Sequence, residues 1–248
     1  NIFLKIDSGM GRLGLIERQW ETVFKKLKNT PSLNLTGLYT HMSKPEDSSI
    51  TLRQNKIFQK ACYHAELNGF SGFEKIAASS RIAIDYPELH YTAVDVGRML
   101  LGMLGPPWSD KLPMKPAIRA VKSRIIQVQD HPPGTNLGIG YGSPIVSKNL
   151  LRTAVIPIGF SDGLNHAPPL GEVLIFGQRA PVLGRRSIEF SLLDISSIKD
   201  AKVGAEVVIL GIQGDAEITP IELADTLGIP MIELLPRIAH NLNRQYFS

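Results

Sequence analysis

The sequence lacks any long apolar run, and none reaches the roughly 18 residues that a membrane-spanning helix requires. No secretory signal is visible either, because residues 1–5 are too short for one and carry no cleavage site. The first residue is Asn1 rather than a methionine. We therefore expect no membrane segment, and we expect the chain to begin inside a longer gene product or to have been processed.

Cysteine is nearly absent too, occurring only at Cys62. A single cysteine excludes an intrachain disulfide and a cysteine metal cluster, and it fits a reducing compartment, so a cytoplasmic location is expected. The sequence also has no metal-spaced histidine pair, no Walker loop and no G-x-S-x-G nucleophile elbow. No resident metal is expected, and the common phosphate-loop and serine-hydrolase classes lack support.

A concentrated basic stripe is missing as well, although the net charge is +4. Only Lys25-Lys26 and Arg185-Arg186 place basic residues side by side. Nucleic-acid-binding proteins usually gather basic residues on one face with aromatic residues between them. We expect no nucleic-acid partner, and we attribute the charge to solubility and to attraction for small anions.

The first part of the chain alternates apolar strands with helical stretches, as in parallel βαβ units. Polar residues follow these strands at Asp7, His41, Ser79-Ser80 and Arg98. In parallel α/β folds, the carboxyl ends of the strands are where sites are built. The expected strands are 2–6, 35–41, 75–78 and one within 91–98, and the expected helices are 17–28 and 50–68.

The pattern changes near Gly105-Pro106-Pro107 to short strands separated by glycine and proline, which is typical of β-sandwiches and barrels. We predict a partial α/β barrel over residues 1–112 and a mostly β domain over 113–248. The expected strands of the second domain are 120–128, 151–158, 172–175, 180–183, 190–195 and 205–210, with one added helix at 218–227.

Only four βα units are visible, whereas a closed barrel of this type needs eight. Half a barrel would leave two open edge strands. Either the other half lies upstream of Asn1, or the fold is not a closed barrel.

Residue chemistry alone leaves each candidate site residue open. Arg12, in the loop after the first strand, suits a carboxylate or phosphate, or it is a surface residue of a tight turn. His41 could contact a cofactor or act as a base, but a lone histidine is more often structural. Ser79-Ser80 could bind phosphate or simply cap a helix. Tyr141, between glycines, could transfer a proton or merely cover a turn.

Taken in order, these segments resemble the alanine racemase family over nearly the whole chain. The matching segments are Lys5 to Gly14 (KIDSGMGRLG), Thr40-His41, the Pro87-Glu88 region with Asp95-Val96-Gly97-Arg98, Tyr141-Gly142, Pro157 to Gly163 (PIGFSDG), Gly211 to Asp215 and Leu235-Pro236-Arg237. Each piece is short, and their shared order and spacing carry the resemblance.

The resemblance implies a cytoplasmic homodimer that holds pyridoxal 5'-phosphate as a Schiff base on a lysine and interconverts L- and D-alanine for peptidoglycan precursors. Each subunit of such enzymes has an eight-stranded barrel and a C-terminal β domain. Two opposed bases move the α-proton, and Tyr141 would be one of them, donated across the dimer. The lysine motif is not found here, so we expect this chain alone to be inactive.

Carried over by position, the resemblance gives each matching residue a role. Arg12 would bind the substrate carboxylate and orient the tyrosine, with Lys5 positioning Arg12. The main chain of Ile188 would contact substrate. The cofactor contacts would be His41 near the ring, Ser80 at the phosphate, Arg98 at the pyridine nitrogen, and the backbone of Leu100 and Leu101 at the phosphate.

Besides the missing lysine motif, three segments depart from the family pattern. Phe160 replaces an entrance tyrosine, Ser187-Ile188-Glu189 stands for Cys-Met-Asp, and Leu100-Leu101 stands for Gly-Ile at the phosphate. Two alternatives therefore stay open: a non-catalytic relative that serves binding or oligomerisation, and a racemase for another amino acid such as serine, lysine or glutamate.

Overall fold

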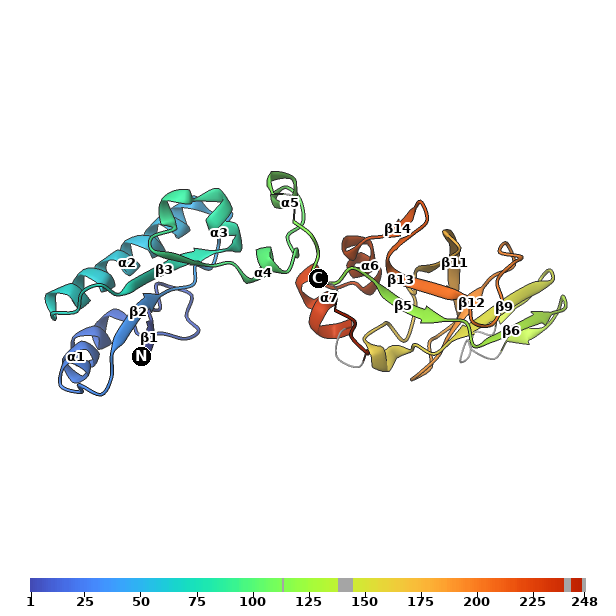
Figure 1. Cartoon of the computed structure of the whole chain (residues 1–248), viewed down its shortest axis with the longest axis horizontal. Helices are drawn as coiled ribbons and strands as arrows, with labels where there is room; N and C mark the ends of the chain where they lie inside the picture. Colours follow the sequence, from blue (N-terminus) through green and yellow to red (C-terminus); the bar gives the residue numbers. More distant parts are fainter. Residues whose placement is uncertain (113, 138–144, 239–241, 247–248) are drawn as a thin grey trace. The chain divides into compact units, whose positions relative to one another are not determined.

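A computed structural model of the protein describes residues 1–112, 114–137, 145–238 and 242–246 (Figure 1). The chain divides into two compact units. Unit 1 comprises Asn1–Gly102 with Pro106–Met114, and unit 2 comprises Met103–Gly105 with Lys115–Ser248.

Unit 1 is built on a four-stranded parallel sheet in the order β1-β2-β3-β4. Neighbours in the sheet are therefore neighbours in the sequence, as the alternating pattern predicts. Its strands are β1 (Ile2–Lys5), β2 (Leu35–Tyr39), β3 (Glu74–Ser79) and β4 (Ala93–Asp95). Its helices are α1 (Glu17–Lys28), α2 (Ser48–Leu67), α3 (Ser80–Asp85), the 3-10 turn η1 (Pro87–Leu89), α4 (Gly97–Leu100) and α5 (Trp108–Lys111).

The core of unit 1 lies between the sheet and the two long helices. Trp20 and Phe24 of α1 and Phe58 of α2 are fully buried against it. Asp47 fixes the start of α2, because its carboxylate accepts a hydrogen bond from the N–H of Ile50 at 3.2 Å. The expected bounds of α1 are confirmed, and α2 begins two residues earlier than expected because of this cap.

Unit 2 is mostly antiparallel β structure, which confirms the expected α/β-plus-β fold class. Seven strands of its main sheet run in the order β14-β13-β10-β11-β12-β9-β6, and β5 pairs with β13. The strands are β5 (Val121–Arg124), β6 (Gln127–His131), β9 (Leu151–Ile156), β10 (Glu172–Ile175), β11 (Gln178–Leu183), β12 (Ser191–Asp194), β13 (Glu206–Gln213) and β14 (Ala216–Ile218), with β7 (Asn136–Leu137) and β8 (Ile145–Val146) as a separate pair.

The single strand expected at residues 120–128 is wrong, because the structure divides it into β5 and β6. The N–H of Ile125 donates to Ala205 at 3.0 Å, and the N–H of Ile126 donates to Val155 at 2.9 Å. At this point the chain changes partner from β13 to β9, which lie near opposite ends of the strand order. No glycine or proline occurs within residues 120–128, so the sequence gives no sign of a break between the two strands.

Two helices close the described chain, where the sequence indicated one. The helix α6 (Pro220–Leu227) begins after Thr219, whose hydroxyl accepts from the N–H of Glu222 at 3.1 Å, while Ile218 belongs to β14. The helix α7 (Met231–Ile238) was not expected, because Pro236 lies within it and proline normally signals a break.

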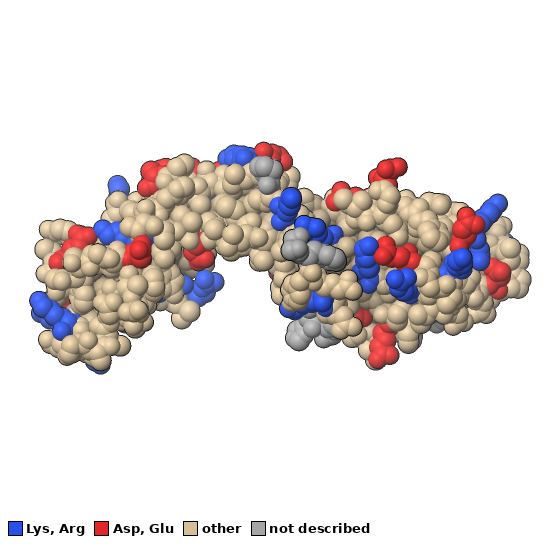
Figure 2. All heavy atoms as spheres, viewed as in Figure 1, with Lys and Arg blue, Asp and Glu red and all other residues tan. Residues whose placement is uncertain are grey.

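Charges of both signs are interspersed on the face shown in Figure 2. No helix among the described residues combines the length and apolar character needed to cross a bilayer. The same residues contain no group of three or more histidine, cysteine, aspartate or glutamate side chains arranged to hold a metal.

Candidate cofactor and substrate site

A cavity of about 390 Å³ lies at the carboxyl ends of the parallel strands of unit 1. Met10 of the loop after β1, His41 after β2, Ser80 after β3 and Arg98 after β4 all line it. Consecutive parallel strands bring their carboxyl ends to one edge, so loops far apart in the sequence meet here. The structure thus brings together His41, Ser80 and Arg98 from the predicted site.

Asp7 shapes the loop that carries Arg12. Its Oδ1 atom accepts hydrogen bonds from the N–H groups of Gly9, Met10 and Gly11 at 2.9, 2.9 and 3.1 Å. Burial of the Asp7 carboxyl opposes ionisation, but these three donors outweigh it and hold its pKa below the ordinary value. Asp7 is therefore a structural anion that folds the loop.

Arg12 itself is exposed. Its loop returns to the sheet at Gly14, where a Cβ atom would lie 2.6 Å from the backbone nitrogen of Asp7. Lys5, at the end of β1, directs its ammonium nitrogen over the Tyr39 ring at 5.5 Å from the centroid. No ion pair links Lys5 to a carboxylate among the described residues.

His41 is half-buried, and its environment favours the neutral imidazole. Burial lowers its pKa, and the positive charge of Arg12 lowers it further, while Asp95 acts in the opposite direction. A neutral imidazole at pH 7 can contact a cofactor ring without adding a charge to the site.

This lowered pKa predicts a pH-dependent stability. As the pH falls below the ordinary value of 6.5, the unfolded chain binds a proton at His41 that the folded protein resists, so the free energy of unfolding decreases. We expect His41→Gln to flatten this decline between pH 7 and pH 5, measured by urea unfolding. Equal slopes in the two proteins would contradict the assignment.

Ser80 and Arg98 are joined through the backbone of α4. The Ser80 hydroxyl accepts a hydrogen bond from the N–H of Met99 at 3.0 Å, which leaves its own O–H to donate. The buried Nε of Arg98 has no hydrogen-bond partner among the described residues. Burial lowers the pKa of Arg98, and the neighbouring Arg81 lowers it further.

The N–H groups of Leu100 and Leu101 already have partners. Leu100 donates to Val96 at 3.0 Å and Leu101 donates to Gly97 at 3.2 Å. A contact from either N–H to a phosphate would have to be shared with these bonds. Side chains, rather than this backbone, are the free donors near Ser80.

Three further predicted residues lie in unit 2, and all three are exposed: Phe160, Ile188 and Glu189. The Ile188 carbonyl accepts hydrogen bonds from the N–H and the hydroxyl of Ser161 at 3.1 and 2.8 Å. The N–H of Phe160 donates to Ser187 at 3.1 Å. Phe160 and Ile188 are therefore presented by two paired loops. Tyr141 lies outside the described residues.

Arg186 was noted in the sequence only as part of a basic pair, yet it is almost completely buried. Its guanidinium donates to the carbonyls of Asn165 and Leu170 at 3.0 and 2.8 Å and to the Ser191 hydroxyl at 3.1 Å. Burial lowers the pKa of Arg186 to about 10. It anchors the loop that ends in Ile188, and no sequence signal distinguishes it from the exposed Arg185.

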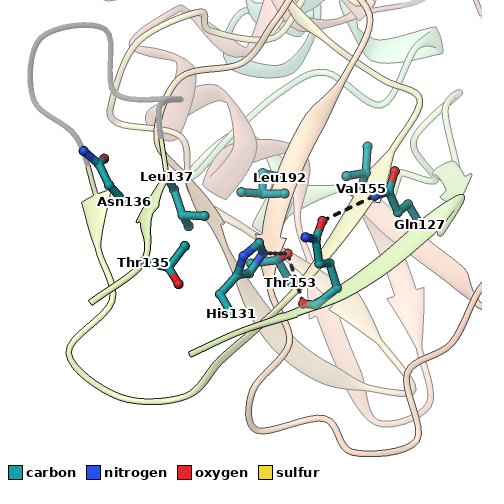
Figure 3. Close-up of a pocket in the computed structure, with 9 residues that line it drawn as sticks. Gln127, His131, Thr135, Asn136, Leu137, Thr153, Val155 and Leu192 are labelled. Carbon is teal, nitrogen blue, oxygen red and sulfur yellow. Dashed lines mark hydrogen bonds between the residues drawn. The ribbon is translucent and has the colours of Figure 1, made fainter. Parts of the chain in front are cut away.

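A second cavity of about 390 Å³ lies in unit 2 between the β7 strand and the sheet (Figure 3). Figure 3 shows His131 and Thr153 facing each other within it, and His131 Nε2 lies 2.9 Å from the Thr153 hydroxyl. Its lining is otherwise uncharged, with glutamine, asparagine and threonine side chains. It lacks the arginines that make the first cavity suited to an anion.

A parallel α/β sheet with a cavity at its strand ends, followed by a mostly β unit, places the chain in the α/β-plus-β class. The sequence model of the alanine racemase N-terminal domain matches residues 1–105, and that of the C-terminal domain matches residues 118–246. The chain belongs to the alanine racemase family.

Relatives named alanine racemase agree with this assignment. The chain is 30% identical to an alanine racemase of Leptospira interrogans over 98% of its length and 34% identical to that of Syntrophobacter fumaroxidans over 100%. The alanine racemase structure from E. faecalis matches with a TM-score of 0.83 at 25% identity, covering 99% of this chain and 65% of that one. The chain spans 65% of the Leptospira protein and 66% of the Syntrophobacter protein.

Proposed function

We propose that the protein acts as an amino-acid racemase that interconverts L- and D-alanine with pyridoxal 5'-phosphate. The observation that carries the proposal is that His41, Ser80 and Arg98, which follow three different strands, line one cavity. Membership of the alanine racemase family supports the reaction and the substrate.

The residues of the cavity fit the cofactor. The Ser80 hydroxyl has a free O–H for a phosphate oxygen, and the unpartnered Nε of Arg98 can donate to the pyridine nitrogen. An arginine there would disfavour protonation of that nitrogen, because a guanidinium does not give up its proton at neutral pH. When bound, the cofactor supplies a conjugated ring system that withdraws electrons from the substrate α-carbon.

The chain's own residues would bind substrate and move one proton. Arg12 would pair with the substrate carboxylate through its two-pronged guanidinium, and Lys5 would hold Arg12 in position. The main chain of Ile188 would contact substrate, with Phe160 at the entrance and Glu189 beside the pocket. Tyr141 would give or take the α-proton on one face.

The remaining parts of the proposal concern assembly. Residues 1–112 would hold the cofactor, and residues 113–248 would carry Tyr141 to the active site of a second subunit in a cytoplasmic homodimer. The base for the other face would be a lysine, and no part of this sequence matches the motif around it. The 248 residues alone would then fail to racemise alanine.

The occupied N–H groups of Leu100 and Leu101 favour one alternative, a relative that binds or oligomerises without catalysis. If the phosphate were held too weakly, the cofactor would not stay bound. A racemase for serine, lysine or glutamate is the other alternative, and comparing kcat/KM among these amino acids and alanine separates it.

The test expresses the longest reading frame that contains these residues, beside the 248 residues alone. The longer product is expected to be yellow from bound cofactor and to form D-alanine from L-alanine, detected with a D-amino-acid oxidase. Failure of that product both to bind the cofactor and to racemise any amino acid would overturn the proposal. Racemisation by the 248 residues alone would overturn the claim about the second base.

A further inference from the structure

Arg81 directly follows Ser80 and lines the same cavity, but no role above requires it. Its buried Nε has no hydrogen-bond partner among the described residues, and its guanidinium forms no ion pair with a described carboxylate. A buried donor without a partner costs free energy that a ligand can recover.

The guanidinium of Arg81 is held in place by an aromatic ring. Its central carbon lies 4.1 Å from the centroid of Trp108. Trp108 in turn donates from its indole nitrogen to Asp85 at 2.6 Å, and Lys111 donates to the other oxygen of Asp85 at 2.7 Å. Asp85, the acid nearest to Arg81 in the sequence, therefore has both oxygens bonded to other groups, and Arg81 acts on it only through its charge, which helps to lower the Asp85 pKa.

Arg81 and Arg98 place two positive charges close together in this cavity. The pKa of Arg98 is lowered mainly by burial, and the positive charge of Arg81 lowers it further. Glu46 and Asp95 also line the cavity, but neither forms an ion pair with these arginines. With Arg98 assigned to the pyridine nitrogen, Arg81 is the second guanidinium of this cavity and forms no ion pair with a described carboxylate, so it favours an anionic ligand group such as a phosphate.

We propose that Arg81 is a phosphate-binding residue, which works with Ser80 to hold the phosphate of the cofactor. Its side chain would supply the charged donor that the occupied N–H groups of Leu100 and Leu101 do not. This inference rests on the proposed function for the identity of the ligand. The affinity for the phosphate group itself is a property of the cavity and can be measured separately.

The first test compares pyridoxal phosphate with pyridoxal, which lacks the phosphate, by titration of the purified full-length protein. Arg81→Gln is expected to weaken binding of pyridoxal phosphate about 10- to 100-fold, the usual effect of removing a hydrogen bond to a charged group. Binding of pyridoxal should stay unchanged. Arg18→Gln, at an exposed arginine of α1, is the matched control and should bind both compounds as the wild type does.

A merely structural role for Arg81 would weaken both compounds equally, and equal weakening would overturn the proposal. So would unchanged binding of pyridoxal phosphate. Arg81→Lys keeps the charge but loses the planar fork, so it is expected to fall between the wild type and Arg81→Gln.

A second readout needs no change at Arg81. Inorganic phosphate that pairs with Arg81 should alter the fluorescence of the stacked Trp108, and Trp108→Phe should abolish the response because Trp20 is buried elsewhere in the core. Absence of a saturable response in the wild type would contradict the proposal. A response to phosphate together with no racemase activity would instead leave Arg81 assigned and overturn only the proposed function.

Discussion

Tyr141→Phe is expected to lower kcat/KM for racemisation about 10²- to 10⁴-fold, the usual contribution of a positioned acid or base. The phenyl ring keeps the size of the side chain but cannot carry the proton. In each direction, the group on one face removes the α-proton and the group on the opposite face supplies a proton, and the two roles are exchanged in the reverse direction. Both directions should therefore slow together, measured from each pure enantiomer by the formation of the other.

Solvent exchange gives this prediction a sharper form. With Tyr141 gone and the opposite base intact, the α-proton of only one enantiomer should exchange with deuterium from D₂O, without inversion. Tyr63→Phe, at an exposed tyrosine of α2, is the control and should racemise at the wild-type rate. Undiminished racemisation by Tyr141→Phe would show that another group serves that face.

Gly159→Ala is expected to lower the free energy of unfolding of unit 2 by about 3 kcal/mol, at the upper end of the range for overpacking. A Cβ atom at position 159 would lie 2.2 Å from the Ile188 carbonyl oxygen and 2.5 Å from that of Ser187. Both atoms belong to backbone and cannot rotate away. The backbone of Gly159 has an ordinary φ of −134°, so the effect is steric rather than conformational.

The two loops that present Phe160 and Ile188 would have to separate, and their hydrogen bonds would be lost together. Urea unfolding followed by far-ultraviolet circular dichroism measures the change. Both tryptophans of the chain, Trp20 and Trp108, lie in unit 1, so their fluorescence should report an unchanged transition. Gly105→Ala is the control, because no atom lies within 4 Å of its added Cβ. Equal stability of the two variants would contradict the prediction.

The sequence was most informative where local pattern and global arrangement agree. In unit 1, apolar strands alternate with helices and pair in sequence order, so the polar residues after each strand could be expected at one edge. Ser80 and Arg98 meet there for this reason. In unit 2, several pairing partners are distant in sequence, and the change of partner at Ile125-Ile126 is marked by no glycine or proline.

The site residues that sequence reasoning missed are both arginines. Trp108 holds the guanidinium of Arg81 by stacking, and the carbonyls of Asn165 and Leu170 accept hydrogen bonds from Arg186. Neither contact can be predicted from the sequence around Arg81 or Arg186, because both depend on how distant loops pack. The role of Tyr141 stays a prediction from the family resemblance.

The change of partner between β5 and β6 also bears on how the chain acquires its structure during synthesis. The strand β5 cannot pair until β13 has been synthesised, and Glu206 of β13 follows its partner Arg124 by 82 residues (206 − 124). Unit 1 pairs each strand with the one just completed. Since folding slows as contacts become more distant in sequence, unit 1 should become protected from proteases first, with unit 2 following once β13 has emerged.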